Sequence, residues 1–545
     1  LLVYNTVTFS VLRRRGLLGM LRVLGATRAD LFRLILRETV LLGLIGTLLG
    51  LLLGTLIGQG LIKLVTRTIN DLYFVLTVSS LLISPAVLLK GFLIGLLASA
   101  AAAIGPAVEA ARTLPQAATR RSGIEYQAHR VAPWLALAGV LSIGLGLLGV
   151  ALPKGGLTIA FAALFLCVIG YALLVPGVLL LLTRLIAPFS GRLFGNTGRL
   201  ATRGIAAGLS RSGIAVAALA VAVSATVGVG VMVESFRETV KLWLQQTLTS
   251  DVYVSLPGSS EQRLRHSLSP ELLSQLERLD GVVSMSTGRA REVDSPYAPA
   301  RLPALGEAPH VHAGFRIKQS EDDPFAAFRR GESVWVSEAL ANHQGLEVGD
   351  ALTLISPHGS QRFRVGAIYF DYSTDRGMIS IDRARYARLW DDPGVTTAGL
   401  KLAADADPPG VTEQVRALAA RSDRPVMVRA NADIRVLSMQ VFDRTFAITG
   451  VLRLLAVGVA FIGVLSALLA LQLERHREHA TLRALGVTPG QLTGLVSLEC
   501  GLMGLTAGLL ALPLGWLMGQ LLIHVVNERS FGWSMQSLLP PGVLG

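Results

Sequence analysis

The chain has 545 residues, of which 51% are hydrophobic and only 16% are charged, and its formal net charge is +13. With a mean hydropathy of +0.54, this composition excludes a disordered or collagen-like chain and disfavours a purely soluble protein. Two cysteines, Cys167 and Cys500, are too few for a disulfide framework or a thiolate metal cluster.

Hydrophobic runs long enough to cross a bilayer recur along the chain. A hydrocarbon core of about 30 Å requires ~20 apolar residues in a helix. Residues 1–12 are predicted to be the end of a truncated span. Seven further spans are predicted at residues 36–65, 83–107, 134–152, 157–183, 213–234, 444–472 and 491–525.

The positive charge is distributed unevenly. Residues 236–443 hold 24 Lys and Arg against 27 Asp and Glu, a balance of −3, so the excess lies in the apolar part. There the basic residues gather in alternate gaps between spans, which follows the positive-inside rule and places these gaps in the cytoplasm. The basic gaps are residues 13–37, 112–130, 184–211 and 475–483. Because this charge lies beside spans, we expect no nucleic-acid partner.

The polar segment 236–443 is predicted to be a water-soluble α+β domain on the outer side of the membrane. It mixes amphipathic helical stretches with short runs of alternating or β-branched residues. The expected strands are 251–254, 333–336, 362–365 and, after a turn at 345–350, 351–355, and the expected helices are 270–279 and 411–420. Residues 432–443 are equally compatible with an interfacial helix and with a helix packed on this domain.

An internal repeat relates the two ends of the chain. Residues 14–58 align with residues 475–519 at a constant offset of 461, and residues 21–27 (LRVLGAT) match residues 482–488 (LRALGVT). Matching arginine, glutamate and threonine residues argue against a chance match of apolar sequence. Both copies begin in a gap assigned to the cytoplasm, so the repeat is parallel.

Each copy combines a short cationic helix, a glycine break and a long span dotted with glycine. In the first copy four glycines at intervals of four residues predict a smooth ridge for close helix packing: Gly46, Gly50, Gly54 and Gly58. Glu38 and Glu499 lie near the cytoplasmic ends of spans, where a carboxylate more often pairs with a basic neighbour or stays hydrated than relays protons.

The repeated Leu-Arg-x-Leu-Gly motif resembles the cytoplasmic coupling motif of the FtsX/MacB/LolC (type VII) class of ABC transporter permeases. In the second copy residues 474–478 (ERHRE) precede it, as in that class. Residues 105–115 (GPAVEAARTLP) resemble the segment that closes the first repeat of these permeases. Residues 336–341 (VSEALA), followed by the turn at 345–350, resemble their MacB-like periplasmic domain.

The chain is most similar to the ten-span, two-repeat YbbP-like subclass. This resemblance implies a mainly α-helical polytopic membrane protein with two FtsX-like repeats and an α+β MacB-like periplasmic domain. It also implies a longer protein, with a span and a periplasmic domain before Leu1 and a span after Gly545. The implied parts are 1–12, the end of a truncated helix; 13–132, the first repeat, with coupling helix and two spans; 133–184, two joining spans; 185–235, a cytoplasmic lead-in and span; 236–443, the periplasmic domain; and 444–545, the second repeat, lacking its last span.

The resemblance implies a permease subunit rather than an enzyme. The sequence has no G-x-x-x-x-G-K-[ST] motif, so we expect no directly bound nucleotide, and we expect no other directly bound cofactor or metal. The resemblance implies that ATP and Mg are held by a separate cytoplasmic ABC ATPase, a dimer in this class. The residues implied to couple to it are Arg14, Leu21, Arg22, Leu24, Gly25, Arg475, Glu478, Leu482, Arg483, Leu485 and Gly486. The first copy departs from the family at Leu17, where the second has Glu478, which predicts asymmetric docking.

The family mechanism is transmission of force across the membrane to periplasmic domains. The resemblance implies that the load is a lipid, lipoprotein or other hydrophobic molecule. The sequence is compatible with this mechanism, since the spans hold few of the charges that line pores for polar solutes. The expected location is the bacterial inner membrane, with the lipid bilayer and a periplasmic protein or enzyme as further partners.

Two other functions remain open from the sequence. The repeat, with Glu38 and Glu499, is compatible with an ion-coupled secondary transporter. A membrane-anchored enzyme would have its active site in 236–443, where five histidines lie without the spacing of a known metal motif, as expected of solvated surface residues. They are His266, His310, His312, His343 and His358.

Overall fold

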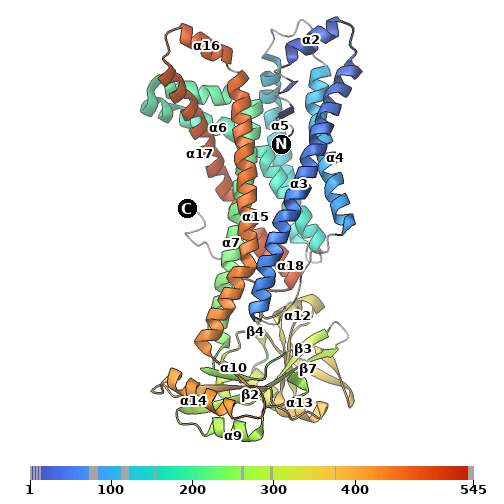
Figure 1. Ribbon diagram of the computed structural model, residues 1–545, viewed down its shortest axis with the longest axis vertical. Coiled ribbons are helices and arrows are strands. Elements are labelled where there is room, and N and C mark those ends of the chain that lie inside the picture. Colours follow the sequence, from blue (N-terminus) through green and yellow to red (C-terminus); the bar gives the residue numbers. More distant parts are fainter. Residues whose placement is uncertain are drawn as a thin grey trace. The chain divides into compact units, whose positions relative to one another are not determined.

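The computed structural model divides into two compact units (Figure 1). It describes residues 3, 6–7, 10–11, 14–72, 84–111, 122–152, 155–258, 263–294, 299–374, 376–474 and 476–537. Unit 1 takes the described residues up to Gly230 together with 444–519, and unit 2 takes residues 231–443 together with those that follow Gly519, up to residue 537.

Unit 1 is helical. Among the described residues, seven helices are long and apolar enough to cross a membrane, and they overlap the seven predicted spans. Three of them, α7, α15 and α17, continue from unit 1 into the sequence of unit 2. The helices are α2 (Arg15–Val23), α3 (Arg28–Leu72), α4 (Pro85–Ala111), α5 (Ser122–Ala151), α6 (Leu157–Ala207), α7 (Leu209–Thr247), α15 (Asn431–Glu474), α16 (His476–Ala484) and α17 (Pro489–Leu521).

Small residues bring the helices of unit 1 close together. On α5, a Cβ atom at Gly139 would lie 2.6 Å from the carbonyl oxygen of Gly170 on α6. A Cβ at Gly146 would lie 2.8 Å from the carbonyl oxygen of Ala163. A side chain at either glycine would push the helices apart, so the sequence of α5 sets its distance from α6.

Helix α6 runs past the predicted end of its span at residue 183. It contains a break at Gly195, whose φ of 60° and ψ of −138° are not helical. The segment predicted as a cytoplasmic lead-in is therefore helical on both sides of a kink. Similarly, α5, α6, α7 and α15 are continuous across the part boundaries expected at residues 132, 184, 235 and 443.

Unit 2 is built on a ten-stranded mixed sheet of order β10-β1-β9-β2-β3-β8-β5-β7-β4, with β6 pairing with β7. Parallel pairs join β3 to β8 and β5 to β7, and the other pairs are antiparallel. The strands are β1 (Val252–Ser255), β2 (Val282–Asp294), β3 (Pro299–Leu305), β4 (Ile317–Ser320), β5 (Ser333–Ser337), β6 (Ala351–Ser356), β7 (Gly359–Tyr369), β8 (Ile379–Asp382), β9 (Thr397–Leu402) and β10 (Met427–Ala430).

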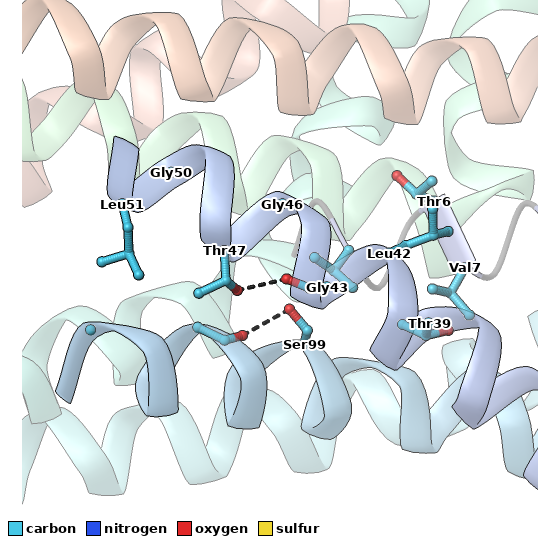
Figure 2. A pocket seen from close by; sticks show the side chains of 13 residues that line it. Thr6, Val7, Thr39, Leu42, Gly43, Gly46, Thr47, Gly50, Leu51 and Ser99 are labelled. Atoms are coloured by element: carbon cyan, nitrogen blue, oxygen red, sulfur yellow. Dashed lines mark hydrogen bonds between the residues drawn. The ribbon is translucent and has the colours of Figure 1, made fainter. Parts of the chain in front are cut away.

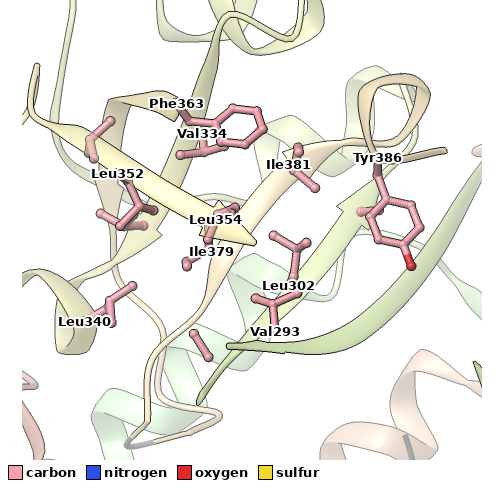
Figure 3. Packing of buried hydrophobic residues seen from close by; sticks show 14 of the residues in the cluster. Val293, Leu302, Val334, Leu340, Leu352, Leu354, Phe363, Ile379, Ile381 and Tyr386 are labelled. Carbon is pink, nitrogen blue, oxygen red and sulfur yellow. The ribbon is translucent and has the colours of Figure 1, made fainter. Parts of the chain in front are cut away.

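Short helices complete unit 2 and cover its hydrophobic clusters. One cluster gathers Leu302, Leu354 and Ile379, all fully buried, from three different strands (Figure 3). Truncating such a leucine to alanine typically costs about 2–5 kcal/mol. The helices are α9 (Pro270–Glu277), α10 (Pro309–Ala313), α11 (Pro324–Arg329), α12 (Glu338–Gln344), α13 (Arg383–Trp390), α14 (Pro408–Ala420), the π-helix η2 (Leu522–Asn527) and α18 (Glu528–Phe531).

The α+β prediction for this segment is confirmed. Every expected strand overlaps an observed one, and α9 and α14 lie at the two predicted helices. Gly345 takes a φ of 65° after α12, where the sequence predicted a turn. Residues 432–443 form the first turns of the continuous helix α15, and Phe442 is buried against Phe236 of α7 within unit 2, which favours packing on this domain.

Candidate functional site

The first copy of the repeated motif ends helix α2 in a tight, hydrogen-bonded turn. The amide of Gly25 donates to the carbonyl of Arg22 at 3.2 Å, and the amide of Ala26 donates to the carbonyl of Leu21 at 2.9 Å. These two bonds define a Schellman C-cap, in which the residue at the Gly25 position must be left-handed. The φ of Gly25 is 99°, a value that side-chain-bearing residues rarely adopt.

The second copy folds in the same way after helix α16. The amide of Gly486 donates to the carbonyl of Arg483 at 3.1 Å, and the amide of Val487 donates to the carbonyl of Leu482 at 3.0 Å. The φ of Gly486 is 98°. Both hydrogen bonds therefore recur at the offset of 461 that relates the two sequences. The repeat is present in the structure as well as in the sequence.

A threonine then caps each long helix that follows. Thr27 and Asp30 bond reciprocally at the start of α3: the Thr27 amide donates to the Asp30 carboxylate at 2.9 Å, and the Asp30 amide donates to Thr27 Oγ1 at 3.2 Å. Thr488 and Gln491 do the same before α17, at 3.0 and 3.3 Å. This capping box was missed in the sequence, although Thr-x-x-Asp and Thr-x-x-Gln stand at equivalent positions.

The apex of each turn exposes a leucine. The side chain of Leu24 is 82% exposed and that of Leu485 is 77% exposed. The preceding leucines, Leu21 and Leu482, are half-buried. Each turn thus presents one apolar side chain to its surroundings from a rigid backbone, which is unfavourable unless another surface covers it.

The helices before the two turns differ in chemistry. Helix α2 exposes three more apolar side chains: Leu17 at 58%, Met20 at 68% and Val23 at 72%. The equivalent positions of α16 carry Glu478, Thr481 and Ala484. Arg22 is half-buried, whereas Arg483 is exposed. The first surface is therefore apolar and the second polar, while asymmetric docking stays a prediction.

An ion pair supports the first turn. The Arg14 guanidinium donates from Nη1 to both carboxylate oxygens of Glu38, at 2.9 and 3.0 Å. Glu38 is thus held by a basic neighbour, as its sequence position favoured. Its repeat equivalent, Glu499, is 4% exposed. Arg475, the repeat equivalent of Arg14, lies outside the described residues.

The predicted glycine ridge is not the surface by which α3 meets α4. That contact uses the neighbouring face, where a Cβ at Gly43 would lie 2.7 Å from Ser99 Cβ. Gly46 and Gly50 instead line a cavity of about 530 Å³, beside Val7 (Figure 2). Among the residues that the structure describes, nothing lies within 4 Å of a Cβ at the ridge glycines Gly46, Gly50, Gly54 and Gly58.

In the second copy, the corresponding ridge is packed. The offset of 461 places Ala507, Ala511 and Gly515 at the positions of Gly46, Gly50 and Gly54. Ala507 and Ala511 are fully buried, and a Cβ at Gly515 would lie 2.8 Å from Val227 Cβ on α7. Close packing on the ridge is therefore observed for α17 with α7.

Two of the five domain histidines are not solvated surface residues, as the sequence had suggested. His312 is 7% exposed among Phe325, Phe328 and Trp335, and burial lowers its pKa. His310 is also partly buried, and its two ring nitrogens lie 3.1 Å from Ser250 Oγ and 2.8 Å from Ser284 Oγ.

The other histidines lie at the surface. His266 and His343 are exposed, and His358 lies 2.9 Å from the exposed carboxylate of Asp391. Within the described ranges, no group of three His, Cys, Asp or Glu residues is placed to hold a metal ion.

Known protein families match most of the chain. The FtsX-like permease C-terminal family matches residues 1–115 and 450–544, and the MacB-like periplasmic core domain family matches residues 212–418. The first family thus matches both copies of the repeat. An ABC transporter permease protein of Mycobacterium tuberculosis is 42% identical over 543 residues, which are 98% of this chain. The chain spans 63% of the length of that relative.

Two solved structures also resemble part of the chain. The periplasmic region of MacB from Actinobacillus actinomycetemcomitans is 16% identical with a TM-score of 0.27, over 35% of this chain and 94% of that one. The extracellular domain of the noncanonic ABC-type transporter YknZ from Gram-positive bacteria is 11% identical with a TM-score of 0.26, over 33% of this chain and 99% of that one.

Proposed function

Because the chain belongs to the FtsX/MacB-type ABC transporter permeases, we propose that it converts the motion of a separate ATPase into movement of the sheet domain of unit 2. It is a multi-pass membrane protein, with seven described helices long and apolar enough to span a bilayer. The proposed location is the bacterial inner membrane, with the two turns in the cytoplasm and unit 2 in the periplasm.

One observation carries this proposal. Two turns of the same hydrogen-bonded geometry, 461 residues apart, each expose a leucine beside an arginine and lead without interruption into a long apolar helix. A rigid turn with an exposed apolar side chain suits insertion into a groove of a partner. The helix that follows would carry any displacement of the turn along its axis.

The partner is proposed to be a cytoplasmic ABC ATPase dimer, with one turn in each subunit. ATP and Mg would be held by that dimer, and this chain would contribute the coupling residues of its two turns. The apolar face of α2 and the polar face of α16 support unequal contacts, because burial of apolar surface would dominate the first and charge the second.

The transported load is proposed to be a lipid, lipoprotein or another hydrophobic molecule, handed to or taken from a periplasmic protein or enzyme. The seven candidate spans are strongly apolar, which supports transmission of force rather than passage of a polar solute. An ion-coupled transporter is less well supported, since the Glu38 carboxylate is already paired with Arg14.

The proposal is tested by introducing charge into the second turn. The Arg483→Asp and Leu485→Asp variants should lose ATPase co-purification from native membranes and ATPase stimulation, because both side chains are exposed at the docking surface. Matched controls place the same charge on exposed positions of unit 2, with Arg424→Asp and Ile355→Asp. Unchanged co-purification and stimulation in both turn variants would refute the proposed function.

A further inference from the structure

The chain that follows α17 packs onto the sheet domain within unit 2. Helix α17 starts at the second turn and passes through η2 into α18 with helical backbone angles at both junctions. Residues 532–537, here called the tail, follow α18 without regular secondary structure. One helical path therefore joins the turn that exposes Leu485 to the tail.

The tail supplies hydrogen bonds to a buried carboxylate on α12. Glu338 is 1% exposed, and its Oε1 accepts from Ser534 Oγ at 2.7 Å while its Oε2 accepts from the Ser534 amide at 3.1 Å. Lys318 Nζ donates to the same carboxylate at 2.6 Å. A buried carboxylate is costly unless it is paired and hydrogen-bonded, and here the tail and Lys318 together supply those partners.

The backbone of the tail is fitted to α12. Gly532 has a φ of 73°, and a Cβ there would lie 2.8 Å from the carbonyl oxygen of Ala339. Asn342 Nδ2 donates to the Gly532 carbonyl oxygen at 2.8 Å. Glycine is thus required both by the backbone angle and by the close approach to α12.

Aromatic contacts join the tail to the two other helices that enter unit 2. The ring of Trp533 stacks on Phe236 of α7, with centroids 5.8 Å apart, and Phe236 contacts Phe442 of α15 at 5.3 Å. Tyr372 meets the edge of Trp533 and donates to the carbonyl oxygen of Ser534 at 2.9 Å. The tail therefore connects α7, α15 and α12 through side chains of unit 2 alone.

We propose that the tail and Glu338 form a coupling clasp, by which displacement of α17 is delivered to α12 and the sheet behind it. This inference rests on the proposed function, because the displacement comes from the partner ATPase. Glu338 is here a positioning residue. It holds the tail through Ser534, and α12 passes the load to β5, whose last residue, Ser337, is the N-cap of α12.

The test is amide hydrogen exchange of the full chain with its co-purified ATPase in nanodiscs, with and without ATP and vanadate. In the wild-type complex, nucleotide should change exchange at α16, in the tail and in β5. In Glu338→Gln, and independently in Gly532→Ala, the Ser534 amide should exchange about 10- to 100-fold faster without nucleotide. The change at α16 should persist in both variants, and the change in β5 should be lost.

A matched control removes a carboxylate of the same domain that makes no contact with the tail. In Glu332→Gln, where Glu332 pairs at the surface with Arg330, the response should equal that of the wild type. A nucleotide-dependent change in β5 that survives in both clasp variants would overturn the clasp alone. If nucleotide does not change amide exchange at α16 in the wild-type complex, both the clasp and the proposed function are overturned.

Discussion

Gly25 and Gly486 stand 461 residues apart and hold φ angles of 99° and 98°. Each closes the same pair of hydrogen bonds behind an arginine-bearing helix. The two turns therefore share one backbone geometry, and the two glycines are the positions at which a side chain would disturb that geometry most.

Replacing either glycine by alanine should loosen its turn. A left-handed residue with a side chain costs roughly 1–2 kcal/mol, so Gly25→Ala and Gly486→Ala should each reduce ATPase co-purification several-fold. The control is Gly19→Ala inside α2, where an added Cβ meets no described atom within 4 Å and alanine favours the helix. If Gly19→Ala reduces ATPase co-purification as much as Gly25→Ala does, the loss reflects a general sensitivity of α2 to substitution and not the geometry of the turn.

Breaking the Arg14–Glu38 pair should have a small effect on stability. The side chains are 55% and 40% exposed, and exposed pairs contribute about 0–1 kcal/mol. We expect Glu38→Gln to leave transport in reconstituted vesicles nearly unchanged, with Arg14→Gln as the matched half of a double-mutant cycle. Abolished transport in Glu38→Gln alone would instead support the ion-coupled alternative.

The packed second ridge should be much less tolerant than an open helix face. A leucine at Gly515 would overlap Val227 and Ser224 of α7, so Gly515→Leu should lower stability by about 1–3 kcal/mol or more. Thermal unfolding in detergent measures this loss. Gly144→Leu is the control, because Gly144 is exposed on α5 with open space beside it, and it should unfold at the wild-type temperature.

The ionisation of Asp371 should lower the stability of unit 2 as the pH rises from 4 to 7. Burial raises the pKa of Asp371 to about 6 from an ordinary 3.8, so its contribution is complete below pH 3.8 and is lost as the pH passes 6. The loss amounts to about 3 kcal/mol at most. The Asp371→Asn variant, which cannot ionise, should show a flatter profile in thermal unfolding of the full chain. An identical slope in the variant would contradict this assignment.

Local patterns predicted much of this molecule. The spans follow from apolar length, and the strands from short β-branched runs such as 333–336. The two turns follow from Gly25 and Gly486 behind matching helices, because a Schellman cap is a local structure with a local sequence signature.

Features that depend on distant contacts were not predictable from one sequence. Nothing near Ser534 indicates that it would bond to Glu338, some 200 positions earlier in the chain. Likewise, glycine spacing alone could not distinguish the packed ridge at Gly515 from the ridge at Gly54, because the difference lies in the neighbouring helix. The burial of His312 depends on three aromatic residues supplied by α11 and β5.

Both turns are proposed to face the cell interior and to bind one ATPase. A photo-crosslinking amino acid placed at Leu24 or at Leu485 in native membranes, followed by identification of the attached protein, tests this arrangement. Both positions should attach to the same ABC ATPase, and neither should be reached by a membrane-impermeant label applied from the periplasmic side. Labelling of either turn from that side, or attachment of neither to an ATPase, would contradict the proposed arrangement.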